Sequence, residues 1–121
     1  MILRKTFRFE ASHVLPKHPG KCSRFHGHSW VLHVFVEGKV NPDTGFVRDY
    51  AEISEAIKPL IERLDHYHLN DFIPYPSSEL ILYWIWPQLP AYIPWSKLAL
   101  EETCTSYAEL TLDEWLKEKQ C

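Results

Sequence analysis

The sequence predicts an α+β fold, in which two helices pack on an antiparallel sheet of four strands. Strand-like alternation of apolar and polar residues occurs near both ends of the chain, whereas helical spacing is concentrated in the middle. No repeat, low-complexity tract or linker divides the 121 residues. The expected order of elements is therefore ββααββ within a single domain that spans residues 1–121.

The first two strands are expected at residues 3–15 and 28–38. In the first, Phe7, Phe9, Ala11 and His13 fall on one face because side chains alternate along a strand. The second reads HSWVLHVFVEG and is followed by the turn sequence NPDTG. The two segments indicate a hairpin.

Two helices are expected in the middle of the chain. Asp49 and Glu52 resemble a capping box and precede apolar residues at helical spacing as far as Leu64, with Pro59 expected to kink that helix or displace one turn. The second helix is expected to open at Pro76-Ser77-Ser78-Glu79, to run through LILYWIWPQL and to stop at Pro90.

Strand character returns in residues 96–110, where one face should carry Leu98, Leu100, Glu102 and Cys104. The tail TLDEWLKEK has the composition of a short helix. An open four-stranded sheet of this kind has free edges, so we expect copies of the chain to associate edge to edge as a homo-oligomer.

Composition excludes several classes of protein. A net charge of −3 gives no basic surface for nucleic acid. The N-terminus MILRKTFRFE does not resemble a signal peptide, and prolines interrupt the most apolar stretch, so no membrane span is expected. Three cysteines form no disulfide framework. We therefore expect a cytoplasmic protein.

Histidines are concentrated near the N-terminus, where residues 13–33 hold five of the seven. His26 and His28 share one face of a strand, and His13 ends the preceding strand. Three imidazoles with an open fourth position are typical of a catalytic zinc site. The alternative for any one of them is a hydrogen-bonded core histidine, and we assign that role to His33, while His18 is expected to be solvated.

Cys22 has two interpretations. As a fourth ligand it would close the tetrahedron and make the zinc structural. As a free thiol beside Lys21 and Arg24 it would act as a base or nucleophile. Spacing alone does not separate the two.

Two further carboxylates have uncertain roles. Asp65 beside His66 suits proton transfer, although histidines at a helix C-terminus are also common because they complement the helix dipole. Glu102 lies in the inward register of an apolar strand, where a ligand with two adjacent N–H donors would satisfy it. An internal ion pair with an arginine, or a register in which Glu101 points inward instead, would explain it equally well.

Six segments in this order resemble the 6-pyruvoyl-tetrahydropterin synthase family: FEASHVLP, CSRFHGHS, GFVRDYAEI, LDHYHLND, PSSE and EETCTS. The resemblance covers residues ~5 to ~107 and is closest to the bacterial branch, the 6-carboxy-5,6,7,8-tetrahydropterin synthases of queuosine biosynthesis. Tyr75-Pro76-Ser77 departs from the family's usual Asn-Pro-Thr, and the DEWLKEKQC tail extends beyond the similarity.

The resemblance implies a role for each matching residue. His13, His26 and His28 match the family's zinc ligands, and Cys22 matches its catalytic cysteine. The resemblance, and not the spacing, thus favours a reactive thiol over a fourth ligand.

By the same resemblance, Asp65 and His66 match a proton-transfer pair that works with the cysteine. Glu102 and Thr103 match the Glu-Thr dipeptide that anchors the pterin ring. The family fold is the tunnelling fold, in which ββααββ subunits join into barrels as hexamers or trimers with active sites at subunit interfaces.

The implied substrate is 7,8-dihydroneopterin triphosphate. In the carboxy branch, zinc-dependent catalysis yields 6-carboxytetrahydropterin, acetaldehyde and triphosphate, and the short CxxxHGH spacing favours this branch. In the pyruvoyl branch, triphosphate is eliminated without carbon–carbon cleavage. A non-catalytic module with structural zinc is the alternative from another class.

Overall fold

The computed structural model describes residues 1–119, so Cys121 lies outside the described residues. Its sheet consists of the strands β1 (Ile2–His13), β2 (His26–Glu37), β3 (Tyr67–His68), β4 (Trp95–Thr103) and β5 (Ser106–Thr111). They lie in the order β3-β1-β2-β4-β5. Each of the four long strands is antiparallel to its neighbours among them, which agrees with the expected ββααββ order.

The short strand β3 is an addition to the four strands predicted. It has two residues, which pair in parallel with Ala11 and Ser12 of β1. Two residues are too few to produce an alternating pattern, so periodicity could not reveal this strand. It runs along the end of β1 that carries His13.

Helix α1 (Tyr50–Leu64) begins where the capping residue predicts. The Asp49 carboxylate accepts a hydrogen bond from the Ala51 N–H at 2.9 Å. Glu52 forms an ion pair with Arg48 at 3.4 Å. The helix continues through Pro59, whose ring is exposed, so water can reach the carbonyl that loses its N–H partner there.

Helix α2 (Ser78–Ile85) is shorter than predicted. Ser77 caps it by accepting from the Leu80 N–H at 3.2 Å. The chain then tightens into a 3₁₀ turn over Trp86–Gln88. The prediction that the helix runs to Pro90 is wrong because Pro87 has no N–H to donate and disfavours the α conformation of the residue before it.

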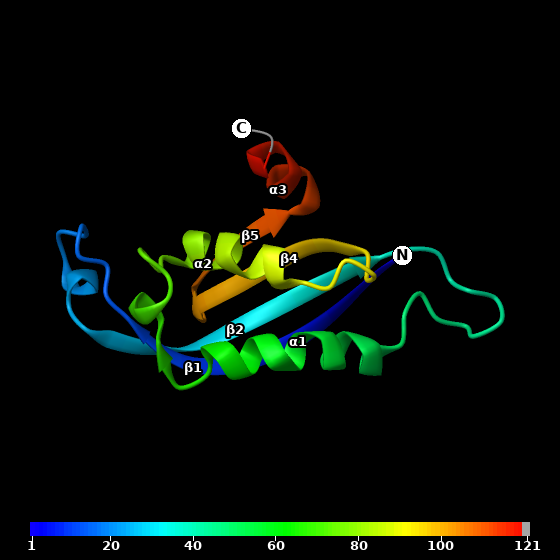
Figure 1. Ribbon diagram of the computed structural model, residues 1–121, viewed down its shortest axis with the longest axis horizontal. Helices are drawn as coiled ribbons and strands as arrows, with labels where there is room; N and C mark the ends of the chain where they lie inside the picture. The colour runs from blue at the N-terminus through cyan, green and yellow to red at the C-terminus, as the bar shows by residue number, and fades with distance from the viewer. Residues whose placement is uncertain (120–121) are drawn as a thin grey trace.

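Both helices pack on the same face of the sheet, with α1 along β1 and α2 along β4 and β5 (Figure 1). Their buried residues join the core-facing positions of the strands in one cluster: Phe9, Trp30, Leu32, Leu98 and Leu100 from the sheet, Ile53, Ile57 and Leu60 from α1, and Ile81, Leu82 and Ile85 from α2. This one-sided arrangement follows from strand alternation, which places the apolar set on a single face.

The C-terminal helix α3 (Leu112–Lys119) follows β5 directly, as the tail composition predicted. Its Trp115 ring stacks on Trp86 at 6.1 Å between centroids.

Within residues 1–119, no helix is both long enough and apolar enough to cross a membrane. In Figure 1 the loop before β2 and the loop before α1 lie at opposite ends of the molecule.

Candidate metal centre and active site

Three histidines converge where β1 ends and β2 begins. His13 pairs with His26 across the two strands, and His28 pairs with Ala11. Since alternate residues share a face, all three imidazoles lie on the core side. The candidate ligand nitrogens lie within 4.8 Å of one another. The structure therefore brings together the three residues that the sequence selected.

Backbone carbonyls orient two of these rings. The Nδ1 of His13 lies 2.7 Å from the Pro76 carbonyl oxygen, and the Nδ1 of His26 lies 2.6 Å from that of Arg24. A carbonyl can only accept, so each Nδ1 carries a proton, and in the neutral form of each ring the lone pair is on Nε2. This arrangement is typical of metal-bound histidines.

Two ring nitrogens of the cluster, one in His13 and one in His28, lack a hydrogen-bond partner. The Nε2 atoms of His13 and His28 are buried and make no hydrogen bond. Buried polar atoms without partners are rare and costly in folded proteins. Three imidazole nitrogens around one point fit a zinc ion and leave a fourth position open.

The pKa values of His13 and His28 favour metal binding. Burial lowers the pKa of His13 below its ordinary value of 6.5, although the hydrogen bond to Pro76 raises it again in part. Burial likewise lowers the pKa of His28. Both rings are therefore neutral at pH 7, and only a neutral imidazole can coordinate a metal.

The indole of Trp30 lies beside the histidines within the core. Its ring contacts His13 and His28 edge to face at 5.1 and 5.2 Å between centroids. Its N–H donates to the Ala11 carbonyl at 3.1 Å. Trp30 was not among the predicted site residues, although its spacing of two from His28 places it at the next core-facing position. It gives the site an apolar wall.

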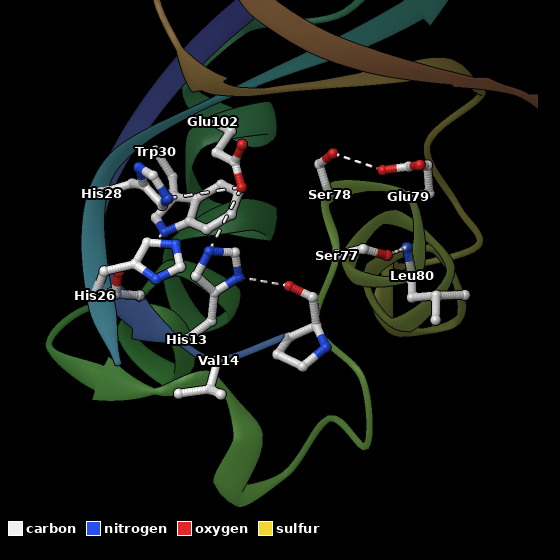
Figure 2. A network of polar contacts seen from close by, with 12 residues as sticks. His13, Val14, His26, His28, Trp30, Ser77, Ser78, Glu79, Leu80 and Glu102 are labelled. Atoms are coloured by element: carbon white, nitrogen blue, oxygen red, sulfur yellow. Dashed lines mark hydrogen bonds and ion pairs between the residues drawn. The ribbon is translucent and has the colours of Figure 1, made fainter. Parts of the chain in front are cut away.

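Glu102 points into the same site (Figure 2). Its Oε1 lies 3.4 Å from the Nε2 of His13 and 3.6 Å from that of His28. The inward orientation predicted for Glu102 thus agrees with the structure, and its neighbours are the imidazoles of His13 and His28 instead of an arginine. Its carboxylate supplies a negative charge beside the open position.

The strand register shifts at Glu102. Pairing between β4 and β5 is irregular between Glu101 and Thr103, so the regular alternation of side chains between the two faces of the sheet is interrupted there. The prediction that Cys104 shares the face of Glu102 is wrong, because Cys104 lies in the exposed turn after the bulge. Thr103 ends β4, and its hydroxyl lies 3.3 Å from that of Thr105.

The first turn of α2 lies across the site from Glu102 (Figure 2). Pro76, whose carbonyl accepts the hydrogen bond from His13, directly precedes the Ser77 cap of this helix. Ser78 donates to Glu79 at 2.8 Å. The site is therefore built from β1, β2, β4 and the start of α2, which are distant in sequence.

Cys22 does not join the histidines as a ligand within this chain. It lies in a 3₁₀ turn (Lys21–Ser23) of the loop between β1 and β2, and its side chain is partly buried. The group of side chains able to hold a metal, within residues 1–119, contains His13, His26 and His28 without Cys22. This geometry favours an open three-histidine site over a closed site with a sulfur ligand.

Asp65 and His66 form a pair at the sheet edge. The Asp65 Oδ2 lies 2.9 Å from the Nδ1 of His66, and its Oδ1 accepts from the Glu10 N–H at 2.7 Å. The hydrogen bond from Glu10, followed by that from His66, lowers the pKa of Asp65, which keeps the carboxylate ionised at neutral pH.

His66 adopts a left-handed backbone conformation with φ of 65°. Such conformations are costly for residues other than glycine and are concentrated at functional sites. Its N–H donates to the Glu10 carbonyl, so one residue of β1 holds both members of the pair. The His66 side chain is 78% exposed and makes no ring contact with the three histidines within residues 1–119.

Comparison with known proteins identifies the family. The family model for 6-pyruvoyl tetrahydropterin synthase matches residues 2–113. The chain belongs to the 6-pyruvoyl tetrahydropterin synthase family. It is 41% identical to the 6-carboxy-5,6,7,8-tetrahydropterin synthase of Synechocystis sp. over 116 residues, which cover 88% of this chain and 90% of that protein.

Other members of the family extend the comparison. The 6-pyruvoyl tetrahydrobiopterin synthase of Dictyostelium discoideum is 34% identical over 76 residues, covering 58% of this chain and 56% of that protein. The structure of the 6-pyruvoyl tetrahydropterin synthase of Caenorhabditis elegans superimposes with a TM-score of 0.84 at 23% identity, covering 92% of this chain and 94% of that one. The predicted tunnelling fold is confirmed by this structural similarity.

In this member of the 6-pyruvoyl tetrahydropterin synthase family, His33 lies apart from the site. Its ring bridges the Thr6 hydroxyl at 2.9 Å and the Glu101 carboxylate at 2.5 Å, on the face of the sheet opposite to the helices. The role predicted for His33 as a hydrogen-bonded residue agrees with this geometry, although the ring is partly exposed.

Proposed function

We propose that this chain is a zinc-dependent 6-carboxy-5,6,7,8-tetrahydropterin synthase of queuosine biosynthesis. It converts 7,8-dihydroneopterin triphosphate and one water to 6-carboxytetrahydropterin, acetaldehyde and triphosphate. The 41% identity to a synthase of that name, over most of both chains, supports the carboxy branch. The CxxxHGH spacing supports the same choice. We expect the enzyme to work in the cytoplasm, where its thiol stays reduced.

One observation carries the catalytic interpretation. The Nε2 atoms of His13 and His28 are buried without a hydrogen-bond partner while the Nδ1 of His13 is occupied by a carbonyl. His13, His26 and His28 would together hold zinc. The ion would supply Lewis acidity toward oxygen atoms of the substrate side chain and so acidify the neighbouring C–H bonds.

Proton transfer falls to two groups outside the histidine cluster. Cys22 acts as a base that takes a proton from the substrate side chain. His66 moves a proton on the other side, with its free Nε2, because the ionised Asp65 carboxylate holds Nδ1–H at 2.9 Å. These transfers lead to the elimination of triphosphate. One water then adds, and cleavage of the carbon–carbon bond leaves the carboxyl group on the pterin and releases acetaldehyde.

Glu102 fixes the position of the pterin ring. A carboxylate accepts two parallel N–H donors in one plane, and the edge of a pterin offers such a pair. The 3.4 Å separation between the Glu102 Oε1 and the His13 Nε2 supports a role as an anchor close to the proposed metal position. Thr103 follows it at the end of β4 and contributes the second half of the dipeptide.

The active sites lie at subunit interfaces of a homo-oligomer, either hexamer or trimer. The Asp65–His66 pair is exposed at a sheet edge, where it is available to a neighbouring copy. Residues 2–10 of β1 and the whole of β5 have one side without a strand partner within residues 1–119. Native mass spectrometry tests this arrangement, and a stable monomer with full turnover would contradict it.

The decisive experiment is an assay for acetaldehyde with zinc-loaded protein and 7,8-dihydroneopterin triphosphate. We expect one acetaldehyde for each substrate consumed. Stoichiometric 6-pyruvoyl product without acetaldehyde would assign the chain to the pyruvoyl branch. Absence of any turnover, with zinc bound, would support a structural-zinc module instead.

The variant Cys22→Ala separates an enzyme from such a module. We expect it to keep its zinc and its circular dichroism spectrum and to lose turnover by about 10²- to 10⁴-fold, the usual contribution of a proton-transfer group. Cys104→Ala is the matched control, because Cys104 lies in an exposed turn, and it should leave turnover unchanged. Loss of zinc and fold in Cys22→Ala would identify the cysteine as a ligand.

A further inference from the structure

The loop that carries Cys22, residues 14–25, connects His13 at the end of β1 to His26 at the start of β2. We call it the thiol loop. Its two ends are joined to one short segment of the chain, residues 67–70, which directly follows the Asp65–His66 pair. Neither the metal ligands nor the roles assigned above account for these contacts.

Asn70 holds the first end of the thiol loop. Its Oδ1 accepts from the Val14 N–H at 2.8 Å, and its Nδ2 donates to the Val14 carbonyl at 2.8 Å. The side-chain amide thus satisfies both backbone groups of one residue, as a neighbouring strand would. The next residue, Leu15, donates its N–H to the Cys22 carbonyl at 2.8 Å. The backbone of Cys22 is therefore hydrogen-bonded to Leu15, the residue next to the Val14 that Asn70 holds.

His68 holds the second end. The Phe25 ring stacks on the His68 ring at 4.7 Å between centroids and 24° between planes. The edge of that imidazole is fixed by a hydrogen bond between its Nδ1 and the Ser12 hydroxyl at 2.9 Å. Phe25 is otherwise 69% exposed, so burial in the core does not explain its position.

We propose that Asn70 is a positioning residue that sets the place of the Cys22 thiol relative to the three histidines. His68 provides a second, weaker restraint at the far end of the loop. The proposal deepens the function proposed above and rests on the role given there to Cys22. It also explains how one segment positions both proton-transfer groups. Residues 65–70 hydrogen-bond to Glu10 and Ser12 at the end of β1 and to Val14 at the start of the thiol loop.

The test is the variant Asn70→Ala, with alkylation of Cys22 by iodoacetamide measured by peptide mass spectrometry in the native zinc protein. Cys104 in the same molecule is the internal reference. We expect the ratio of Cys22 to Cys104 alkylation rates to rise about tenfold, because loss of two hydrogen bonds favours local opening by roughly that factor. Zinc content and circular dichroism stay unchanged.

Turnover provides an independent measurement. We expect Asn70→Ala to lower kcat by about 10- to 100-fold, because small displacements of a reacting group have effects of that size. KM changes little, since Asn70 does not contact the proposed pterin anchor. Asn41→Ala is the matched control: its carboxamide oxygen also accepts a backbone N–H, at 2.8 Å, in the loop at the other end of the molecule. Asn41→Ala should change neither the alkylation ratio nor kcat.

Asn70→Asp keeps the size of the side chain and the acceptor for the Val14 N–H, but it replaces the donor with a carboxylate oxygen that repels the Val14 carbonyl. It should also raise the alkylation ratio and lower kcat, and it decides the matter if Asn70→Ala does not fold. An unchanged alkylation ratio in both soluble variants would overturn the proposal. Loss of zinc together with the thiol effect would also overturn it, because Asn70 would then support the metal site as a whole.

These outcomes are distinguishable from failure of the proposed function. If Cys22→Ala retains full turnover, the catalytic role of the thiol is wrong, whatever Asn70 does. If Cys22→Ala is inactive while Asn70→Ala has wild-type alkylation and kcat, only the positioning role is wrong.

Discussion

At the scale of single residues, the orientation of each imidazole decides what the site can bind. Carbonyl groups fix the proton of His13 and of His26 on Nδ1, which leaves the opposite nitrogens as donors to a metal. His33 has both ring nitrogens engaged, by Thr6 and Glu101. The difference between a ligand and a structural histidine here lies in the partners of the second nitrogen.

This difference predicts the effect of removing each ring. His13→Ala should abolish stoichiometric zinc binding, because two remaining nitrogens do not make a catalytic zinc site. His33→Ala should retain zinc, since its ring belongs to the opposite face of the sheet. Inductively coupled plasma mass spectrometry of both proteins after dialysis measures the metal. Full zinc in His13→Ala would contradict the assignment of ligands.

Glu102 and Glu101 form a second matched pair of neighbours. Glu102→Gln should raise KM for the pterin substrate about 10- to 100-fold, because hydrogen bonds to a charged group contribute about 1.5–3 kcal/mol. Zinc content should stay unchanged. Glu101→Gln should leave KM near the wild-type value, since Glu101 contacts His33. If zinc is lost in Glu102→Gln, the carboxylate is a metal ligand and not a substrate anchor.

At the scale of elements, the site depends on where strands and helices begin and end. The pairing of His13 with His26 sets the distance between two candidate ligands, and the segment just before α2 supplies the Pro76 carbonyl. A one-residue slip between β1 and β2 would move a ligand to the other face. The register is held by the apolar residues that follow, Phe9 opposite Trp30 among them.

The N-terminus of α2 should therefore influence metal affinity. Ser77→Ala removes the cap of α2 and should cost about 1 kcal/mol of folding free energy. Zinc affinity should fall with it, because the turn that holds the Pro76 carbonyl loosens and outer hydrogen bonds tune ligands. Asp49→Ala removes the matching cap of α1 at a similar cost, and its zinc affinity should not change. Equal zinc affinities for the two variants would contradict the coupling.

At the scale of the whole molecule, the burial of the metal site links pH to stability. Burial lowers the pKa of His13 and His28 below 6.5 in the folded chain, while the unfolded chain keeps the ordinary value. Below pH 6.5 the unfolded state therefore binds more protons than the folded state. The free energy of unfolding of the zinc-free protein should fall as pH decreases through this range.

Thermal unfolding of the zinc-free protein from pH 7.5 to 5.5 measures this effect. Carboxylates contribute little in that window, because their ordinary pKa values lie below about 4.5 and the pKa of Asp65 is lower still. A double variant, His13→Gln with His28→Gln, should show a flatter dependence of Tm on pH. An identical dependence in the two proteins would contradict the prediction.

Much of the site was predictable because its ligands follow simple periodicities. Two-residue spacing placed His26 and His28 on one side, and the alternation of β1 placed His13 with Phe9 in the core. The cap of α1 at Asp49 and the opening of α2 within Pro76–Glu79 were likewise readable from local sequence. These features depend on contacts within a few residues, so the sequence by itself determined them.

Other features depend on pairings between distant segments, and only the tertiary structure decided them. Asn70 reaches Val14, Pro76 reaches His13, and the two-residue strand β3 reaches β1. The bulge that parts Glu102 from Cys104 depends on pairing between β4 and β5. Single hydrogen bonds between side chains and backbone leave no repeating pattern in a sequence, because their partners are set by how the elements pack.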